Sequence, residues 1–542
     1  MLETALSPGR FRLWAGVIAF AILATVSVGS ANAQDEHTLV VAAQATPNGL
    51  DWEYNYAPAD HQIRRAVYSK LLSLKFEKDS AGMWLPVLQP KTVLVGQLAK
   101  SWELSNGGRT ITFKLNKGIK SPFGNEFTSE DLNWTWTRSW GLKSSGVFYA
   151  GTVLGVKDFE SATKVIDRYT WSFTTPSRNA LLEMIWINND LDVFDSTEAR
   201  KHVTNDDPWA KNWLATHSAG YGPYHVTEFS AGQQVVLRPN PNWHEPAPYF
   251  TTIVYRQVPQ PANQLALVKG GQADVAEYLP AQFVNTAKRD EAAFKVWTTD
   301  GNRLFQIFFN WKHKPFDNRT VRKALLYATP ADTIRKSVYL DLADELKSVM
   351  PPTYPGYDPR WYNYPYNIEK AKALLAEAGV DNLTFELTVP STDAAQTSAS
   401  VILKDAMAKA GITVEIKQVS MAVYSQARND GSLQAFFFPT FPIIPDAGYA
   451  LPLMYSCSAW TFTANGYCNP KYDKLVRKAN TLVDQGERQK LFSEGVRVLL
   501  EEDAGVALIA REFWSLVTGP DIEGVSWDTP NVFYFDRLSR SK

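Results

Sequence analysis

The sequence is poor in the residues and motifs that mark common catalytic and metal sites. Its 542 residues include two cysteines and seven histidines, and the histidines follow no H-E-x-x-H or zinc-ligand spacing. It contains no G-x-S-x-G elbow, phosphate-binding loop or dinucleotide fingerprint. We therefore predict no metal, no cofactor and no catalytic residue. A secreted hydrolase whose two carboxylates lie far apart in the sequence would leave no such motif, so it stays open as an alternative.

Long apolar runs are also absent, with one exception at the N-terminus. Two arginines precede an apolar run over residues 13–28, and Ala31-Asn32-Ala33 follows it. This order of charged, apolar and small residues is typical of a signal peptide, which we predict over residues 1–33. A membrane anchor is the alternative, but the run is shorter than the ~20 residues that a bilayer span needs. Because Gln34 would be the first mature residue and is not a cysteine, we expect a free periplasmic protein and not a lipoprotein.

Charge, length and cysteine content further restrict which class of protein the sequence can encode. The formal net charge is −1, which gives no electrostatic footprint for a nucleic acid. The mature chain exceeds one ordinary hydrophobic core, so we expect two or more domains. In an oxidising compartment, Cys457 and Cys468 suit one disulfide that closes a short loop.

A β-α-β pattern lies in the second half of the chain. Apolar and polar residues alternate over 383–389 and again over 412–416, which predicts two strands. Residues 395–410 between them have a helical pattern that Gly411 ends. Parallel strands joined by a right-handed crossover form an α/β layer, and ligands of such layers bind outside the carboxyl ends of the strands. The predicted fold class is therefore α/β.

Local signals place further elements in the first part of the chain. An apolar run over 37–42 predicts a buried strand, and residues 62–72 have a helical pattern. Thr128 is a predicted N-cap with Asp131 three residues later, as in a capping box.

Blocks of turns, caps and strands follow one another in a fixed order over nearly the whole mature chain. The most specific blocks are Gln97-Leu-Ala-Lys-Ser-Trp-Glu-Leu104, Gly107-Gly-Arg-Thr-Ile-Thr-Phe-Lys-Leu115, Thr128-Ser-Glu-Asp-Leu-Asn133, Gly220-Tyr-Gly-Pro-Tyr224, Gly270-Gly-Gln-Ala-Asp274, Pro315-Phe-Asp-Asn-Arg-Thr-Val-Arg-Lys-Ala-Leu325 and Tyr467-Cys-Asn-Pro-Lys-Tyr-Asp-Lys-Leu475. In this order the sequence resembles the family 5 extracellular solute-binding proteins, which are the peptide and nickel binders of ABC importers.

This resemblance implies a two-lobed periplasmic binding protein-like fold (type II, cluster C-like) with an extra accessory domain. It implies a first lobe of residues 35–80, 218–312 and 506–542, an accessory domain of 81–217 and a second lobe of 313–505. The ligand, a dipeptide or oligopeptide, would be enclosed by hinge closure. The protein would act as a monomer that delivers the ligand to the permease and ATPase of an ABC transporter.

One segment departs from the family pattern. In peptide binders of the family, a Trp followed closely by an Asp in the second lobe places a carboxylate against the ligand's ammonium group. When the chain is aligned on Pro445-Asp446, Phe438 stands at the Trp position and Phe441 at the Asp position. A shifted alignment is the alternative, since loops vary in length. Otherwise another acid substitutes, with Asp446 or Asp60 as candidates, or the ligand has no ammonium group.

The resemblance also suggests cleft-lining residues, although each could equally serve packing. They are Tyr56, Asp60, Phe438, Phe441, Asp446 and Trp460. A peptide-binding protein is the first functional hypothesis. The second is the same fold binding an oligosaccharide, an opine-like conjugate or a metal complex, and the third is the hydrolase.

Overall fold

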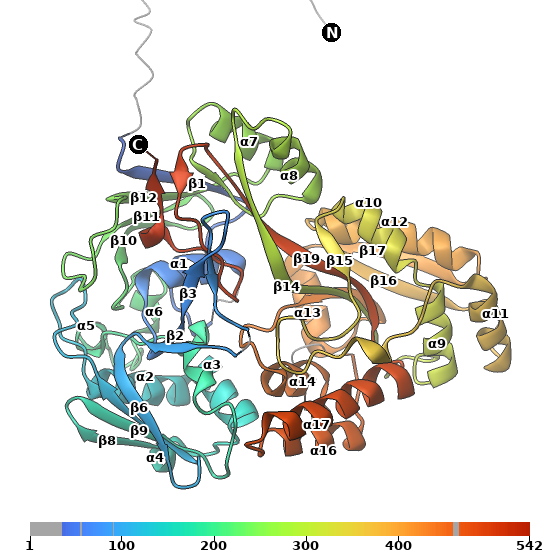
Figure 1. Ribbon diagram of the computed structural model, residues 1–542, viewed down its shortest axis with the longest axis horizontal. Coiled ribbons are helices and arrows are strands. Elements are labelled where there is room, and N and C mark those ends of the chain that lie inside the picture. Colours follow the sequence, from blue (N-terminus) through green and yellow to red (C-terminus); the bar gives the residue numbers. More distant parts are fainter. Residues whose placement is uncertain (1–34, 55–56, 90, 459–464, 542) are drawn as a thin grey trace, which may run out of the picture. The chain divides into compact units, whose positions relative to one another are not determined.

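The computed structural model describes residues 35–541 except 55–56, 90 and 459–464, and Figure 1 shows its ribbon. Residues Glu36–Lys542 form one compact unit. The predicted signal peptide lies outside the described residues. In the part of the chain that is described, no helix is both long and apolar enough to cross a membrane.

A mixed sheet runs through the unit. Its strand order is β10-β11-β12-β1-β13-β19-β14-β18-β16-β17, and β15 (Ala343–Glu345) pairs with β19 off this path. Two long antiparallel strands, β14 (Lys295–Phe309) and β19 (Ala507–Thr518), lie in the middle (Figure 1). Because β19 pairs with β13 and β14 pairs with β18, these two strands join a first half of the sheet to a second half.

The strands of each half are as follows. The first half consists of β10 (Tyr224–Ser230), β11 (Gln234–Pro239), β12 (Thr252–Gln257), β1 (Thr38–Ala43) and β13 (Val275–Ala276). The second half consists of β18 (Ala435–Thr440), β16 (Thr384–Pro390) and β17 (Thr413–Val419).

Both faces of β1, in the first half, are buried. β1, β12 and β13 are parallel, and alternate residues of β1 point to two different cores. One core includes α1 (Pro58–Val67), and the other includes α7 (Pro261–Lys269) and α8 (Ala281–Lys288). Parallel strands covered on both faces form continuous apolar runs, which explains the apolar sequence of β1. The C-terminal segment, residues 519–540, returns to pack in the same core as α1.

The second half contains the predicted β-α-β unit. β16 and β17 are parallel, and α12 (Ala394–Ala408) connects them, so this prediction is confirmed. One face of this half is covered by α9 (Arg319–Ala328), α10 (Ala331–Tyr339), α11 (Ile368–Glu377) and α12. The other face is covered by α13 (Met421–Asp430), α14 (Ala447–Tyr455), α16 (Pro470–Ala479) and α17 (Gln485–Arg497).

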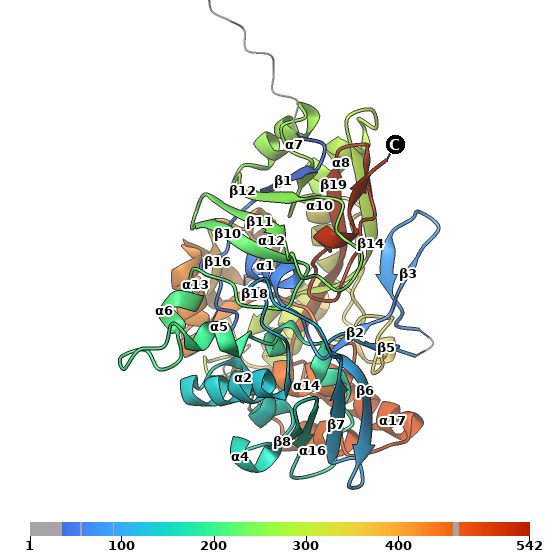
Figure 2. The ribbon, with the colours of Figure 1, turned by 90° about the vertical axis from the view of Figure 1, so that its left-hand side faces the viewer.

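A separate antiparallel sheet is formed by four strands in the order β6-β7-β9-β8. Its strands are β6 (Ala99–Ser105), β7 (Thr110–Leu115), β9 (Thr170–Thr174) and β8 (Thr163–Asp167). Figure 2 shows β6 and β7 side by side, with α2 (Ser129–Leu142) nearby. The predicted capping box at the start of α2 is confirmed, because the Thr128 N–H donates to Asp131 at 2.8 Å. Asp131 thus satisfies a backbone donor outside the first turn.

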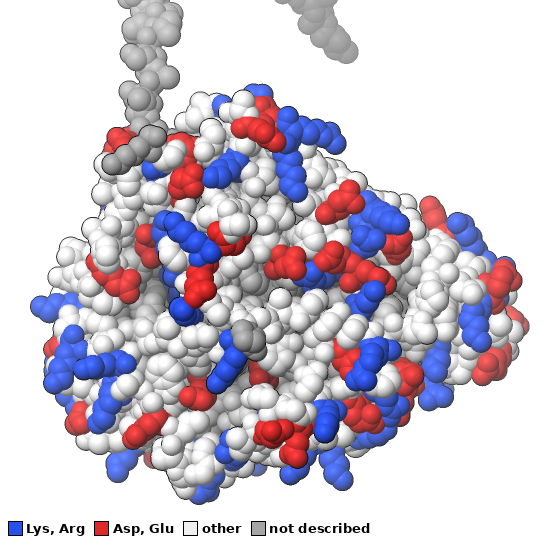
Figure 3. Space-filling view, viewed as in Figure 1, with Lys and Arg blue, Asp and Glu red and all other residues white. Residues whose placement is uncertain are grey.

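Shorter elements complete the fold. They are β2 (Leu72–Leu74), β3 (Phe76–Lys78), β4 (Trp84–Pro86), β5 (Leu94–Gly96), α3 (Ser145–Phe148), α4 (Phe159–Ala162), α5 (Ser196–Arg200), α6 (Lys211–Leu214), β20 (Ile522–Glu523) and β21 (Ser539–Arg540). Cys457 and Cys468 form a disulfide. Basic and acidic side chains are interspersed over the face in Figure 3.

One helix differs from the expectation, and several strands were missed, the two long central strands β14 and β19 among them. α1 spans Pro58–Val67 and not residues 62–72. Proline at the first helical position fixes φ at a helical value, so the helix starts four residues earlier than its apolar pattern suggests. It ends before Tyr68, whose backbone is extended. The sequence reasoning did not predict β14, because its second part, Leu304–Phe309, lacks the alternation of a half-buried strand.

Candidate functional site

Asn302 joins segments from both halves of the sheet. It lies on β14 and is 1 % exposed. Its Nδ2 lies 3.0 Å from the Tyr354 hydroxyl and 3.0 Å from the carbonyl of Pro442, in the loop after β18. The same Nδ2 lies 2.8 Å from the Thr529 carbonyl, and Asn302 Oδ1 accepts from Asn531 at 3.0 Å. Because Thr529 and Asn531 belong to the C-terminal segment of the first half, this one side chain ties the two halves together.

Two of the predicted cleft residues lie in the segment that ends β18. Phe438 is half-buried, and its ring lies 6.5 Å from that of Phe308. Phe441, three residues later, is also half-buried and packs against the same core. Contact of either ring with a ligand stays a prediction.

Arg428 of α13 lies over this aromatic segment. Its guanidinium carbon is 4.4 Å from the centroid of the Phe438 ring, a cation–π distance. Its Nη2 donates to the side chain of the adjacent Asn429 at 3.2 Å. Among the described residues its Nε has no hydrogen-bond partner, and burial lowers the pKa of the guanidinium. A cation therefore lies beside the half-buried ring of Phe438.

Asp446 has a structural role that the sequence did not reveal. Its carboxylate accepts the Gly448 N–H at 2.7 Å and thereby caps α14. Both of its oxygens also accept from Arg488 of α17, at 2.8 and 3.1 Å. The two side chains are buried, so this is a closed, neutral pair. This arrangement argues against Asp446 as the partner of a ligand's ammonium group.

Asp60 also holds the backbone around it. Its carboxylate accepts the N–H groups of Ala57 at 2.6 Å and Asn48 at 3.3 Å, which fixes the loop before α1. The side chain is buried, and burial raises the pKa of the carboxyl. The other two predicted residues, Tyr56 and Trp460, lie outside the described residues.

The sequence reasoning missed a buried acid at the carboxyl end of β13. Glu277 is 3 % exposed and accepts a hydrogen bond from the hydroxyl of Tyr255, on β12, at 2.6 Å. The next residue, Tyr278, donates its hydroxyl to the Asn531 carbonyl at 3.2 Å. An acid directly after a short buried strand was the signal available in the sequence. It lies at the edge of a parallel sheet where ligands bind.

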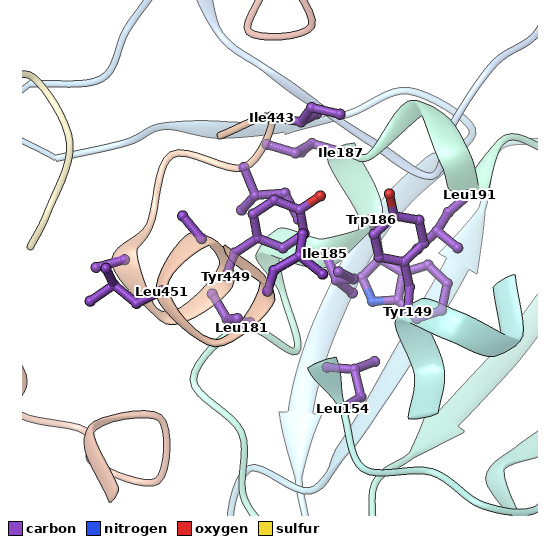
Figure 4. Packing of buried hydrophobic residues seen from close by; sticks show 14 of the residues in the cluster. Tyr149, Leu154, Leu181, Ile185, Trp186, Ile187, Leu191, Ile443, Tyr449 and Leu451 are labelled. Carbon is purple, nitrogen blue, oxygen red and sulfur yellow. The ribbon is translucent and has the colours of Figure 1, made fainter. Parts of the chain in front are cut away.

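Figure 4 shows apolar packing between α14 and the segment around Tyr149. The rings of Tyr149 and Tyr449 are stacked with centroids 6.2 Å apart. The Tyr149 hydroxyl donates to Asp190 at 2.5 Å, and Arg64 of α1 also bonds Asp190. Ile187 and Ile443 lie beside these rings in Figure 4. Apolar contacts therefore connect α14 with residues 149–191.

The geometry of these segments provides groups that can bind a ligand. Within the described ranges, no group of three or more His, Cys, Asp or Glu side chains is placed to hold a metal ion. The site offers a buried acid, a buried amide and half-buried aromatic rings, which recognise a ligand by charge, hydrogen bonds and stacking.

Comparisons with known proteins agree with the expected fold. The model of the family described as bacterial extracellular solute-binding proteins, family 5 Middle, matches residues 93–462. The dipeptide-binding protein of Escherichia coli (strain K12) is 22 % identical, and the match covers 98 % of each chain.

Solved structures extend the likeness. The periplasmic binding protein DppA from Helicobacter pylori, in complex with the peptide STSA, superposes with a TM-score of 0.82 at 22 % identity. It covers 93 % of this chain and 98 % of its own. AgaA from A. tumefacien R10, in complex with agropinic acid, has a TM-score of 0.79 at 19 % identity and covers 93 % and 99 %. The predicted two-lobed α/β fold is thereby confirmed.

Proposed function

The chain belongs to the bacterial extracellular solute-binding proteins, family 5, and from this membership we propose that it captures short peptides and delivers them to an ABC importer. We place it in the periplasm, as a monomer that is exported by a cleaved signal peptide. Its partners there are the permease and ATPase of the importer. The family consists of solute-binding proteins, so the proposal includes no chemical change of the ligand.

We assign the lobes as the sequence suggests. The first lobe is 35–80, 218–312 and 506–542, the second is 313–505, and 81–217 form the accessory domain. On this assignment β14 and β19 pass between the lobes and serve as the hinge. A ligand that contacts both lobes then favours the closed arrangement, because its binding free energy is available only there.

The observation that supports hinge closure is the position of Asn302 in the middle of this two-strand connection. Its side chain bonds Pro442 on one side and Thr529 on the other, and it is buried. In an open arrangement these groups would separate and exchange their bonds for water. The free-energy difference between the two arrangements is then small, since hydrogen bonds to water replace those lost. Because this difference is small, ligand binding can determine which of the two arrangements is populated.

A direct test is to identify what the protein carries. The full chain is exported into a bacterial periplasm, purified and denatured, and the released small molecules are identified by mass spectrometry. We expect short peptides of mixed sequence. Titration calorimetry with the dipeptide Met-Leu and the tetrapeptide STSA then gives affinities. Release of another compound class, together with no binding of either peptide, would contradict the peptide assignment.

A second candidate function is supported by the pairing of Asp446 with Arg488. Because Arg488 neutralises this acid and position 441 is Phe, the segment after β18 offers no free carboxylate to an amino terminus. A ligand without a free amino terminus, such as an opine-like conjugate, an oligosaccharide or a metal complex, would suit that segment. The mass spectrum of the released molecules distinguishes these classes from peptides.

A further inference from the structure

Glu277 is buried without meeting a positively charged side chain in the described part of the chain. It directly follows β13 and is 3 % exposed. Within the described ranges its carboxylate has one side-chain partner, the Tyr255 hydroxyl, 2.6 Å away. Burial raises the pKa of the carboxyl to about 8, and the hydrogen bond from Tyr255 opposes this rise. In the free protein at neutral pH, Glu277 therefore holds a proton.

Another buried glutamate shows how this chain surrounds an acid that serves the fold. Glu53 is 1 % exposed, and burial raises its pKa to about 8 as well. It accepts from the hydroxyls of Ser139, at 2.6 Å, and Ser144, and it lies 3.4 Å from the guanidinium of Arg138. Among the described residues, Glu277 has a single hydroxyl in place of this shell. Because a buried acid with few partners destabilises the folded state, packing gives no reason for a carboxylate at position 277.

The position of Glu277 connects it with both halves of the sheet. β1, β12 and β13 are parallel, and Glu277 stands at the carboxyl end of β13, where sheets of this kind bind ligands. Tyr278 follows with a φ of 57°, a conformation that non-glycine residues seldom adopt. Its hydroxyl bonds Asn531, which bonds Asn302, which bonds Pro442 in the loop after β18. This chain of hydrogen bonds leads from the residue after Glu277 to the aromatic segment of the second half.

We propose that Glu277 receives the positively charged group of the ligand, such as the ammonium of a peptide or another protonated amine. The inference rests on the proposed function, because it takes the ligand to be enclosed between the two halves. A cation beside this carboxylate would supply the charge partner that the described residues do not provide. The acid that meets the ligand then lies on the first half, because Asp446 of the second half is held by Arg488.

The test compares the wild-type chain with Glu277→Gln, and Glu53→Gln is the matched control. Both substitutions replace a buried glutamate by its neutral isostere, but Glu53 lies in the Arg138 shell and outside the proposed site. Each protein is titrated by calorimetry with Met-Leu and with N-acetyl-Met-Leu, which lacks the ammonium group. We expect Glu277→Gln to weaken Met-Leu binding about 30-fold or more. We expect Glu53→Gln to leave it within threefold, and the acetylated dipeptide to bind weakly to all three proteins.

A second readout covers ligands other than peptides. The three proteins are exported into the same periplasm, and the compounds they release on denaturation are compared by mass spectrometry. The inference would be supported if wild type and Glu53→Gln release compounds with an amine or guanidine group and Glu277→Gln does not. This holds even if none of the compounds is a peptide and the proposed function fails. Equal Met-Leu affinity of wild type and Glu277→Gln would overturn the inference and leave peptide binding intact. Release of uncharged or purely anionic compounds, or neither release nor Met-Leu binding, would overturn it as well.

Discussion

Replacing Asp446 by asparagine tests whether this acid serves the fold or a ligand. Asp446 is 4 % exposed and Arg488 is 2 % exposed, and two hydrogen bonds of 2.8 and 3.1 Å join them. Asparagine removes the negative charge and leaves the guanidinium buried without its counter-ion. Breaking one partner of such a pair lowers the free energy of unfolding by about 3–5 kcal/mol. The side-chain oxygen that accepts the Gly448 N–H is retained, so the cap of α14 survives.

The expected shift in melting temperature follows from the size of the protein. The entropy of unfolding is about 2.1 cal/mol/K per residue, or ~1 kcal/mol/K for a chain of ~500 residues. Asp446→Asn should therefore lower Tm by ~3–5 °C in a calorimetric scan of the ligand-free protein. Asp446→Ala also loses the cap and should lower Tm by about a further 1 °C, since such a cap contributes about 1 kcal/mol.

Two controls separate the roles of the pair. Adding Arg488→Met to Asp446→Asn removes the unbalanced charge and should restore most of the lost Tm. Ligand affinity, measured well below Tm, should be the same in wild type and Asp446→Asn. An unchanged Tm together with lost affinity would refute the reasoning, because it would show that the carboxylate meets the ligand and not Arg488.

Three further outcomes are expected. Denatured but unreduced protein should give no free thiol, because Cys457 and Cys468 are bonded, and a count of two would contradict the disulfide. Glu277→Gln should stabilise the ligand-free protein as pH rises from about 4.5 to 8. In that range folded Glu277 keeps a proton that the unfolded chain releases, so the free energy of unfolding of the wild type falls as pH rises. If the free energies of unfolding of the two proteins depended on pH in the same way, this prediction would be contradicted. Asn302→Ala should lower Tm and enlarge the radius of gyration measured by X-ray scattering, because each buried group left without its partner costs about 1–3 kcal/mol. An unchanged Tm and radius of gyration would show that Asn302 does not link the two halves.

Local signals in the sequence predicted those elements that depend on neighbouring residues. The capping box of Thr128 and Asp131 needs a spacing of three residues, and the unit over 383–416 needs a change of period from strand to helix and back. Both features can be recognised within a short stretch of sequence. The start of α1 was misplaced because the apolar pattern begins later than the helix, which Pro58 initiates.

The site depended on contacts that no short stretch contains. Asp446 is paired with an arginine 42 residues later, so its sequence neighbourhood could not distinguish a buried ion pair from a ligand contact. Asn302 bonds Tyr354, Pro442 and Thr529, which lie 52, 140 and 227 residues away. Glu277 lies three residues after the recognised block that ends at Asp274, yet its significance lies in the absence of a cation in contact with it among the described residues. Such an absence is a property of the packed structure and not of the sequence pattern.

The assignment of Glu277 links ligand capture to protonation. With a pKa of about 8, the free carboxyl is mostly protonated at neutral pH, whereas a carboxylate is the form that stabilises a bound cation. Binding of a cationic ligand then releases a proton from Glu277, and the affinity for that ligand weakens as pH falls below 8. Tyr255 and Tyr278 face this acid, and Asp60 faces the same Tyr255. The nearest cation on this side is Arg303, which faces Tyr278 and pairs with Glu512 at 3.3 Å. Burying Glu277 lowers the stability of the free protein, and a bound cation restores this stability by supplying the missing positive charge. The carboxylate is therefore neutralised in the closed, occupied state.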